Sequence, residues 1–243
     1  MKLLLHACCG PCSLEPTRIL RAAGHDLTIY YANSNIAPAE EYARRRDTLA
    51  AWAESEGLPV VEGPYAPDAW EGAAGRFGLC DGDPAAREQR CRACYRLRFE
   101  EAARVAAERG FDAVGTTLSV SPYQYTEAIR EELERAAAGA GVAALFEDYR
   151  PYYEEATRRS RRLSMYRQNY CGCRFSAAEA AAERAERKRA RAAEREAEAA
   201  AHAEERAAEE AARAAKRAER AAYAEKQARK RAALRALREQ KRD

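Results

Sequence analysis

The sequence lacks the apolar segments that direct a chain to or across a membrane. No stretch approaches the ~20 apolar residues needed to span a bilayer, and no apolar run with a cleavage site follows Met1-Lys2. We therefore expect a soluble, cytoplasmic protein without a membrane partner. Because thiols stay reduced in that compartment, we expect the eight cysteines to be metal ligands or redox thiols and not structural disulfides.

A second absence divides the chain. Residues 177–243 contain no Gly, Pro or Cys, and before Leu234 they lack Leu, Ile, Val, Met, Phe and Trp. They carry 19 Lys and Arg against 14 Asp and Glu, a net charge of +5, which leaves −2 for the rest. This indicates one folded domain over 1–176 and a low-complexity charged tail over 177–243, helical or disordered and without a heptad seam. The tail is either a solvated extension or a basic arm that contacts RNA phosphates.

Strand and helix patterns alternate through the first domain. Because β and α segments alternate, we expect an α/β fold with a parallel sheet flanked by helices. Residues 63–83 are rich in Gly and Pro and predict loops with a short helix. The expected strands are 2–6, 26–32, 60–61, 112–117 and 142–146, and the expected helices are 11–23, 38–55, 84–109 and 122–138.

The stretch that organises the chain runs from Leu3 to Ser13. A buried aliphatic strand stops at Cys8, Cys9 and Cys12, and Pro11 suits the first position of a helix. The carboxyl end of a strand is where open α/β sheets hold ligands. A helix N-terminus also favours thiolate over thiol. We interpret these cysteines as ligands and not as packing.

A second pair of cysteines extends this site. Cys91 and Cys94 stand three apart on one face of an expected helix. With Cys8 and Cys9 they make four thiolates from two regions, which fits a 4Fe-4S cluster. The alternative is a structural zinc site, but Cys8-Cys9 does not supply the C-x-x-C of a zinc knuckle.

Four other residues, a cysteine pair and two single side chains, invite an assignment. Cys171-Gly172-Cys173 is too tight for a cluster and suits an easily reduced disulfide that relays electrons, with two further metal ligands or a chance pair as alternatives. Cys80 has no firm role. His6 is a ligand, an acid or, as we expect, a histidine satisfied at the end of a strand.

Taken together, these residues resemble the epoxyqueuosine reductase family QueH over essentially all of 1–176 and none of the tail. Each motif alone is weak, but the ordered set is highly specific. The matching motifs are Leu-His-Ala-Cys-Cys-Gly-Pro-Cys at 5–12, Asn-Ser-Asn-Ile-Ala-Pro at 33–38 with Glu41-Tyr42, Cys-Arg-Ala-Cys-Tyr-Arg-Leu-Arg at 91–98, Thr-Thr-Leu-Ser-Val-Ser-Pro at 116–122 and Tyr-Arg-Gln-Asn-Tyr-Cys-Gly-Cys at 166–173.

The resemblance implies a Rossmann-like domain of the adenine-nucleotide α-hydrolase (HUP-like) kind. It implies reduction of epoxyqueuosine to queuosine at the tRNA wobble position, the last step of queuosine biosynthesis, without cobalamin. By similarity, the cluster ligands are Cys8, Cys9, Cys91 and Cys94, and Cys171 with Cys173 form the redox-active disulfide. A further mononuclear iron would then have Cys12 as a candidate ligand. The family pattern explains neither Cys80 nor the tail.

This function requires partners and protons. The partners are tRNA carrying epoxyqueuosine and an unidentified electron donor, and the proton donor is Asp81, Tyr170 or water. We expect tyrosines to stack on RNA bases and arginines to contact RNA phosphates. The candidate tyrosines are Tyr30, Tyr31, Tyr123, Tyr152, Tyr153 and Tyr170, and the candidate arginines are Arg158, Arg159, Arg161 and Arg162.

Two other functions compete with this one. The first is a zinc-stabilised RNA-binding module with no redox activity. The second is an ATP-using tRNA thiolation enzyme, which would need a Gly-rich phosphate loop where this chain has cysteines.

Overall fold

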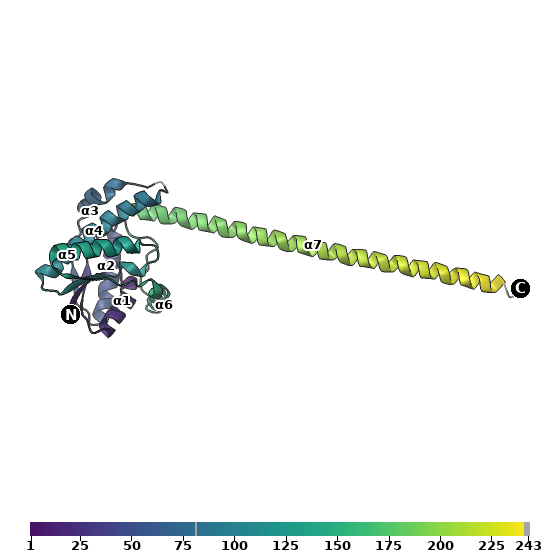
Figure 1. The fold of residues 1–243 in the computed structure, drawn as a ribbon, viewed down its shortest axis with the longest axis horizontal. Helices are drawn as coiled ribbons and strands as arrows, with labels where there is room; N and C mark the ends of the chain where they lie inside the picture. Colours follow the sequence, from purple (N-terminus) through teal and green to yellow (C-terminus); the bar gives the residue numbers. More distant parts are fainter. Residues whose placement is uncertain (81, 241–243) are drawn as a thin grey trace. The chain divides into compact units, whose positions relative to one another are not determined.

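The protein is built on a five-stranded parallel sheet with strand order β3-β2-β1-β4-β5. Figure 1 shows the labelled helices of the body around the strands. The structure, a computed structural model, describes residues 1–80 and 82–240, without the side chains of 204 and 232–240. The strands are β1 (Lys2–His6), β2 (Asp26–Tyr31), β3 (Val60–Glu62), β4 (Ala113–Thr116) and β5 (Ala143–Leu145). The Rossmann-like parallel sheet expected from the sequence is confirmed.

Both faces of the sheet are covered, and this explains the unbroken aliphatic run in β1. Side chains alternate along a strand, so Leu4 points to one hydrophobic cluster while Leu3 and Leu5 point to another. All three are buried. A strand buried on both faces loses the polar alternation of a half-exposed strand, as parallel sheets do.

Helices form the outer layers. The cluster around Leu4 includes residues of α4 (Pro84–Glu108) and α5 (Thr126–Ala140), which pack on each other. The cluster around Leu3 and Leu5 includes residues of α1 (Gly10–Ala22) and α2 (Ala39–Ser55). The remaining elements of the body are α3 (Pro67–Ala73), η1 (Gly75–Phe77), η2 (Leu118–Val120), η3 (Arg150–Tyr152) and α6 (Tyr153–Arg162).

One helix starts later than expected, and a second helix was not predicted. Residues 122–125 precede α5 as a turn, in which Ser121 Oγ accepts from the Tyr123 amide at 3.3 Å. A serine oxygen that bonds the chain two residues on competes with helix formation. Helix α6 was not predicted, because its buried residues are only Ala156 and Ser160 and so give no apolar periodicity.

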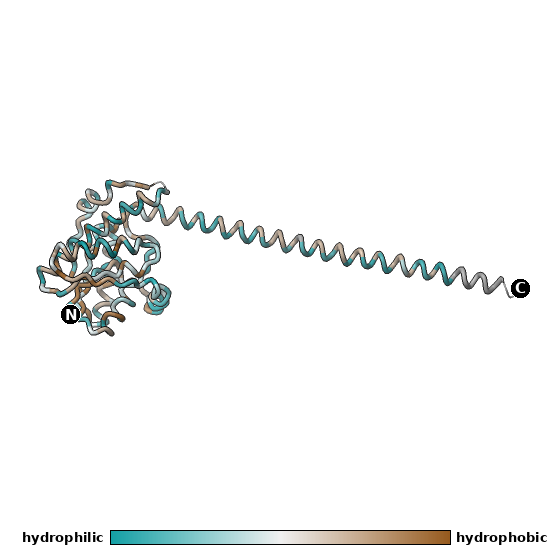
Figure 2. The backbone as a smooth tube through the Cα atoms, in the orientation of Figure 1, coloured by the Kyte–Doolittle hydropathy of each residue, from teal (hydrophilic) through white to brown (hydrophobic). Residues whose placement is uncertain are grey.

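The chain divides into two compact units, Met1–Ala181 and Ala182 onward. Helix α7 (Arg174–Gln240) begins in the first unit and makes up the described part of the second. From 182 to 231 nearly all the described side chains are exposed. Figure 2 shows polar colours recurring along α7. The division into 1–176 and 177–243 stays a prediction. Within the described residues no helix combines the length and apolar character needed to cross a membrane.

Candidate metal centre

The candidate site lies where the order of the strands reverses. The chain passes from β1 outward to β2 and β3 and later returns to place β4 on the other side of β1. A crevice at the carboxyl ends of two such strands is the usual ligand position in open α/β sheets. His6, the last residue of β1, pairs with Thr116, the last residue of β4. Cys8 and Cys9 follow directly, so the fold delivers them to this crevice.

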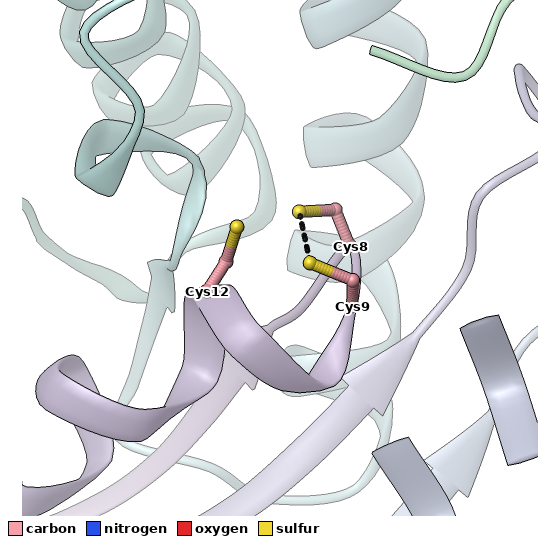
Figure 3. A group of neighbouring side chains, drawn as sticks. All are labelled: Cys8, Cys9 and Cys12. Atoms are coloured by element: carbon pink, nitrogen blue, oxygen red, sulfur yellow. Dashed lines mark hydrogen bonds between the residues drawn. The ribbon is translucent and has the colours of Figure 1, made fainter. Parts of the chain in front are cut away.

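Cys8, Cys9 and Cys12 form a compact group of thiols. Their sulfur atoms all lie within 4.8 Å of one another, and the Cys8 and Cys9 sulfurs are 3.7 Å apart. Figure 3 shows the three side chains pointing toward one another at the start of α1. Thiolates around one tetrahedral ion would be about 3.8 Å apart, given a metal–sulfur bond of about 2.3 Å. The group therefore has the spacing of a metal site.

The electrostatics of the group concentrate negative charge on one sulfur. Hydrogen bonds from Cys12 and Cys8 hold the pKa of the Cys9 thiol well below its usual value. The side-chain amide of Gln168 also donates to Cys9 Sγ, at 2.9 Å. Hydrogen bonds to Cys8 and Cys9 raise the pKa of Cys12, and burial adds to this effect. A thiolate that is stabilised by several hydrogen-bond donors can act as a ligand for a metal cation.

The cysteines of α4 lie within electrostatic reach of Cys171 and Cys173, whereas the close sulfur group found among the described residues contains only Cys8, Cys9 and Cys12. Cys91 packs against the buried cluster that contains Cys8 and Cys9, and Cys94 packs with Cys173 in a smaller cluster around Trp70 and Phe175. Burial raises the pKa of Cys91, and it raises that of Cys94 to about 11. Both pKa values stay raised although Arg90 acts on Cys91 and Arg98 on Cys94 in the opposite direction, so both groups are thiols at neutral pH.

Arg98, one turn beyond Cys94, is a buried positive charge in this region. Its charge offsets part of the rise in the pKa values of Cys8 and Cys94, and it adds to the lowering of the pKa of His6 that burial causes. Its partner is the amide oxygen of Asn33, and among the described residues it meets no carboxylate. A buried guanidinium without a counter-ion is costly. The site is therefore suited to a group with negative charge.

The Cys171-Gly172-Cys173 loop is fixed by contacts from another layer. The buried Arg45 donates to the Cys171 carbonyl at 2.8 Å, and the Gly172 carbonyl accepts from the Ala37 amide at 2.9 Å. A Cβ on Gly172 would lie 3.0 Å from Ile36 Cγ1 and 3.2 Å from Arg45 Nη1, at a φ of +139°. Glycine is therefore required between the two cysteines. All eight cysteines of the chain are free thiols.

Comparison with known proteins identifies the family. The profile described as epoxyqueuosine reductase QueH matches residues 3–179. The chain belongs to the QueH family. The matched range ends shortly after α7 begins, so the family accounts for the body and not for the second unit.

Several curated relatives share this membership. The epoxyqueuosine reductase QueH of Histophilus somni is 35% identical over 181 residues, covering 72% of each chain. That of Thermotoga maritima is 32% identical over 189 residues, covering 76% of this chain and 94% of the relative. By family, the protein is an oxidoreductase. Among solved structures, a predicted subunit of a tRNA methyltransferase from Methanocaldococcus jannaschii aligns with a TM-score of 0.42 at 12% identity over 66% of this chain and 76% of that one.

Within this QueH body, His6 has the structural role that the sequence favoured. Its ring nitrogens lie 3.2 Å from Thr116 Oγ1 and 3.3 Å from the Ala32 carbonyl oxygen. Burial, assisted by Arg98, lowers its pKa to about 3. His6 is therefore neutral and joins β1 to its neighbours.

Other predicted site residues lie at the edge of the centre or outside it. The Tyr170 hydroxyl donates to the Ala37 carbonyl at 2.9 Å, so its proton serves a loop contact, and its role as a proton donor stays a prediction. Asp81 lies outside the described residues. Cys80 is buried 3.3 Å from Arg90 Nη1 and accepts from that guanidinium.

The residues expected to contact RNA differ in exposure. Tyr30 and Tyr31 are fully buried and pack within the sheet, whereas Tyr123 is 61% exposed. Arg159 pairs with the buried Glu15 at 2.7 Å. Burial therefore excludes Tyr30 and Tyr31 as stacking surfaces.

Sequence reasoning did not single out three residues that contact or act on the candidate thiols: Arg45, Arg98 and Gln168. Two of them carry a signal in hindsight. Glu41 and Arg45 stand four apart on α2 and form an ion pair at 2.7 Å, and Arg98 stands four residues after Cys94 on the same helix face. Gln168 has no such helical spacing, although it lies in the motif at 166–173.

Proposed function

We propose that this protein reduces epoxyqueuosine to queuosine at the wobble position of tRNA, without cobalamin. The cofactor would be a 4Fe-4S cluster held by Cys8, Cys9, Cys91 and Cys94. The main support is one buried cation without a described carboxylate, Arg98, whose charge acts on Cys8 of the β1–α1 loop and on Cys94 of α4, in a chain of the QueH family.

The residues present fit such a group. Thiolates are the protein ligands of iron–sulfur clusters. The Arg98 guanidinium lacks a carboxylate among the described residues, and an anionic thiolate-bound cluster would compensate its charge. The carbonyl oxygen of the Gln168 side chain is buried without a described partner, beside Cys9. When bound, the cluster would transfer single electrons, and a further iron near Cys12 would act as a Lewis acid.

The reaction balances with the dithiol of Cys171 and Cys173. Converting an epoxide to an alkene with release of water requires two electrons and two protons. Two thiols that join as one disulfide release two electrons and two protons. The sum is epoxide plus dithiol giving alkene, water and disulfide, and an external electron donor must reduce the disulfide before the next turnover.

The protein's own residues prepare this exchange. Arg45 and Ala37 fix the backbone of the Cys171-Gly172-Cys173 loop, so the two thiols have a defined position. Burial raises the pKa of Cys173, which keeps that thiol protonated and able to deliver its proton. The substrate is one nucleoside of a tRNA, so the wobble base must be splayed out of its stack to reach buried sulfurs.

A zinc-stabilised RNA-binding module without redox activity is the second candidate. The observation in its favour is the Cys8–Cys9 sulfur distance of 3.7 Å, which is close to that expected around a single tetrahedral ion. Colour and metal content of protein purified without oxygen separate the candidates. A brown sample with iron and sulfide supports the reductase, and a colourless sample with zinc supports the module.

Nucleoside analysis of tRNA from a deletion strain tests the function in the cell. We expect epoxyqueuosine to accumulate, the wild-type gene to restore queuosine, and a Cys171→Ser variant to fail. A Cys80→Ser variant is the matched control, because Cys80 is a buried cysteine outside the family pattern, and it should restore queuosine. Normal queuosine content in the deletion strain, where no other epoxyqueuosine reductase is encoded, would refute the proposal.

A further inference from the structure

Charge is not evenly mixed along α7. Residues 194–210 carry seven Glu against two Arg, whereas 213–231 carry eight Lys and Arg against two Glu, a net charge of +6. At a rise of 1.5 Å per residue, the basic segment is about 27 Å long. A solvated helix that serves only as a spacer requires no such separation of charge. We call residues 213–231 the basic segment.

Within the basic segment, four cations share one face of the helix. At 100° per residue, Arg213, Lys216, Arg217 and Arg220 fall within an arc of about 100° and span about 10 Å. All four side chains are exposed. Close positive charges repel one another, and an anion placed along this face would relieve the repulsion.

Few carboxylates compensate these cations. Among the described residues, Lys216, Arg217 and Arg220 form no ion pair, and Arg213 meets Glu209 at 3.4 Å in an exposed pair. Exposed ion pairs contribute little to stability, so a phosphate can displace Glu209 from Arg213. The same face carries no apolar stripe, which argues against a partner helix.

We propose that the basic segment is an RNA-binding arm that contacts the phosphate backbone of tRNA. The inference rests on the proposed function, because that function makes a tRNA the substrate. Phosphate contacts by Lys and Arg carry no sequence information, so the arm would strengthen binding of any tRNA and leave the choice of nucleoside to the thiol site. The acidic stretch 194–210 would be repelled by RNA and would confine the contact to the basic segment.

The test measures binding of an unmodified tRNA transcript to the full chain as a function of salt. The arm variant combines Arg213→Gln, Lys216→Gln, Arg217→Gln and Arg220→Gln. The control variant places four Gln residues on another face of the same turns, at Ala214, Ala218, Ala221 and Ala222, and keeps every charge. Gln is a good helix former, and far-ultraviolet circular dichroism should give equal helix content for all three proteins.

We expect the arm variant to bind the transcript at least ~10-fold more weakly at about 50 mM salt, and its log–log salt slope to be shallower by about four. The control variant should match the wild type. An arm variant with wild-type affinity and slope would overturn the proposal. So would unchanged tRNA binding together with weakened binding to anionic lipid vesicles, because the arm would then serve a membrane surface.

The transcript lacks epoxyqueuosine, so this outcome is independent of catalysis. If wild-type protein cannot reduce epoxyqueuosine yet shows the arm-dependent slope, the reductase proposal fails and the arm is supported. If wild-type protein reduces epoxyqueuosine and the arm variant binds like the wild type, the arm proposal fails alone.

Discussion

Replacing Arg45 with Met tests whether a buried cation on α2 fixes the loop of Cys171 and Cys173. Arg45 Nε donates to Glu41 at 2.7 Å, and its other nitrogens donate to the carbonyls of Cys171 at 2.8 Å and Tyr170 at 3.3 Å. Its side chain is 1% exposed and that of Glu41 is 9% exposed. Arg45→Met would therefore leave a buried carboxylate with no cation and two carbonyls with no donor.

The expected loss can be stated. Breaking a buried ion pair from one side costs about 3–5 kcal/mol. For a body of this size each kcal/mol corresponds to about 2–4 °C, so the unfolding midpoint should fall by about 6–20 °C. Adding Glu41→Gln should restore part of this loss, because the unpaired charge is removed. The assay is thermal unfolding of the full chain, monitored at the aromatic residues of the body.

Arg46→Met is the matched control for this experiment. Arg46 is the next residue on the helix, is 38% exposed, and pairs with Asp47 at 2.9 Å and Glu62 at 3.5 Å. Exposed pairs of this kind contribute about 0–1 kcal/mol, so the midpoint should fall by less than ~4 °C. Equal small shifts in the Arg45 and Arg46 variants would refute the anchoring role of Arg45.

Three further changes address the site and its support. Arg98→Met should lower the affinity for iron by about 10–100-fold, as loss of a supporting residue near a metal does. Arg104→Met, on the exposed face of α4, is the control and should leave the iron content unchanged. Equal iron content in the two variants would contradict a charge-compensating role for Arg98. Glu15→Gln should make the unfolding midpoint depend less on pH in the acid range. Burial raises the pKa of Glu15, but hydrogen bonds from Arg159 and Arg18 lower it overall. Glu15 therefore adds stability above its unfolded-state pKa of about 4.3, and this stability is lost as the pH falls through its lower folded-state pKa. Unfolding midpoints measured from pH 7 to pH 3 should show this loss in the wild type and not in the variant. Cys171→Ser should retain iron and sulfide but stop after at most one turnover, and sustained turnover in a multiple-turnover assay would remove the dithiol from the scheme.

Much of the fold was predictable because local patterns and global packing agree. The aliphatic run of β1 continues into cysteines and then Pro11, and each signal corresponds to one event: a doubly buried strand, a loop at the crevice and a helix start. The disagreements lie where side chains are small or bond locally. Helix α6 buries only Ala156 and Ser160, and the turn before α5 uses the Ser121 hydroxyl.

The positions of the cysteines in the candidate site could be predicted from the sequence, but the buried arginines around them could not. Adjacent cysteines after a strand point to the crevice, so the group of Cys8, Cys9 and Cys12 follows from topology. Arginine is almost never fully buried unless paired, so the i, i+4 spacings of Arg45 and Arg98 alone did not predict that these side chains are buried beside thiols. Their burial depends on partners far along the chain, the Cys171 carbonyl and Asn33, which only the folded structure brings close.

The most direct measurement is a single-turnover reaction under anaerobic conditions. Protein purified without oxygen and reduced beforehand is mixed with tRNA that contains epoxyqueuosine, and the nucleosides are analysed by mass spectrometry alongside iron, sulfide and zinc content. The account predicts a brown, iron- and sulfide-containing protein that converts epoxyqueuosine to queuosine, with loss of conversion when Cys91 and Cys94 are both changed to Ser. A zinc-containing protein that binds the tRNA and leaves the epoxide intact would contradict it.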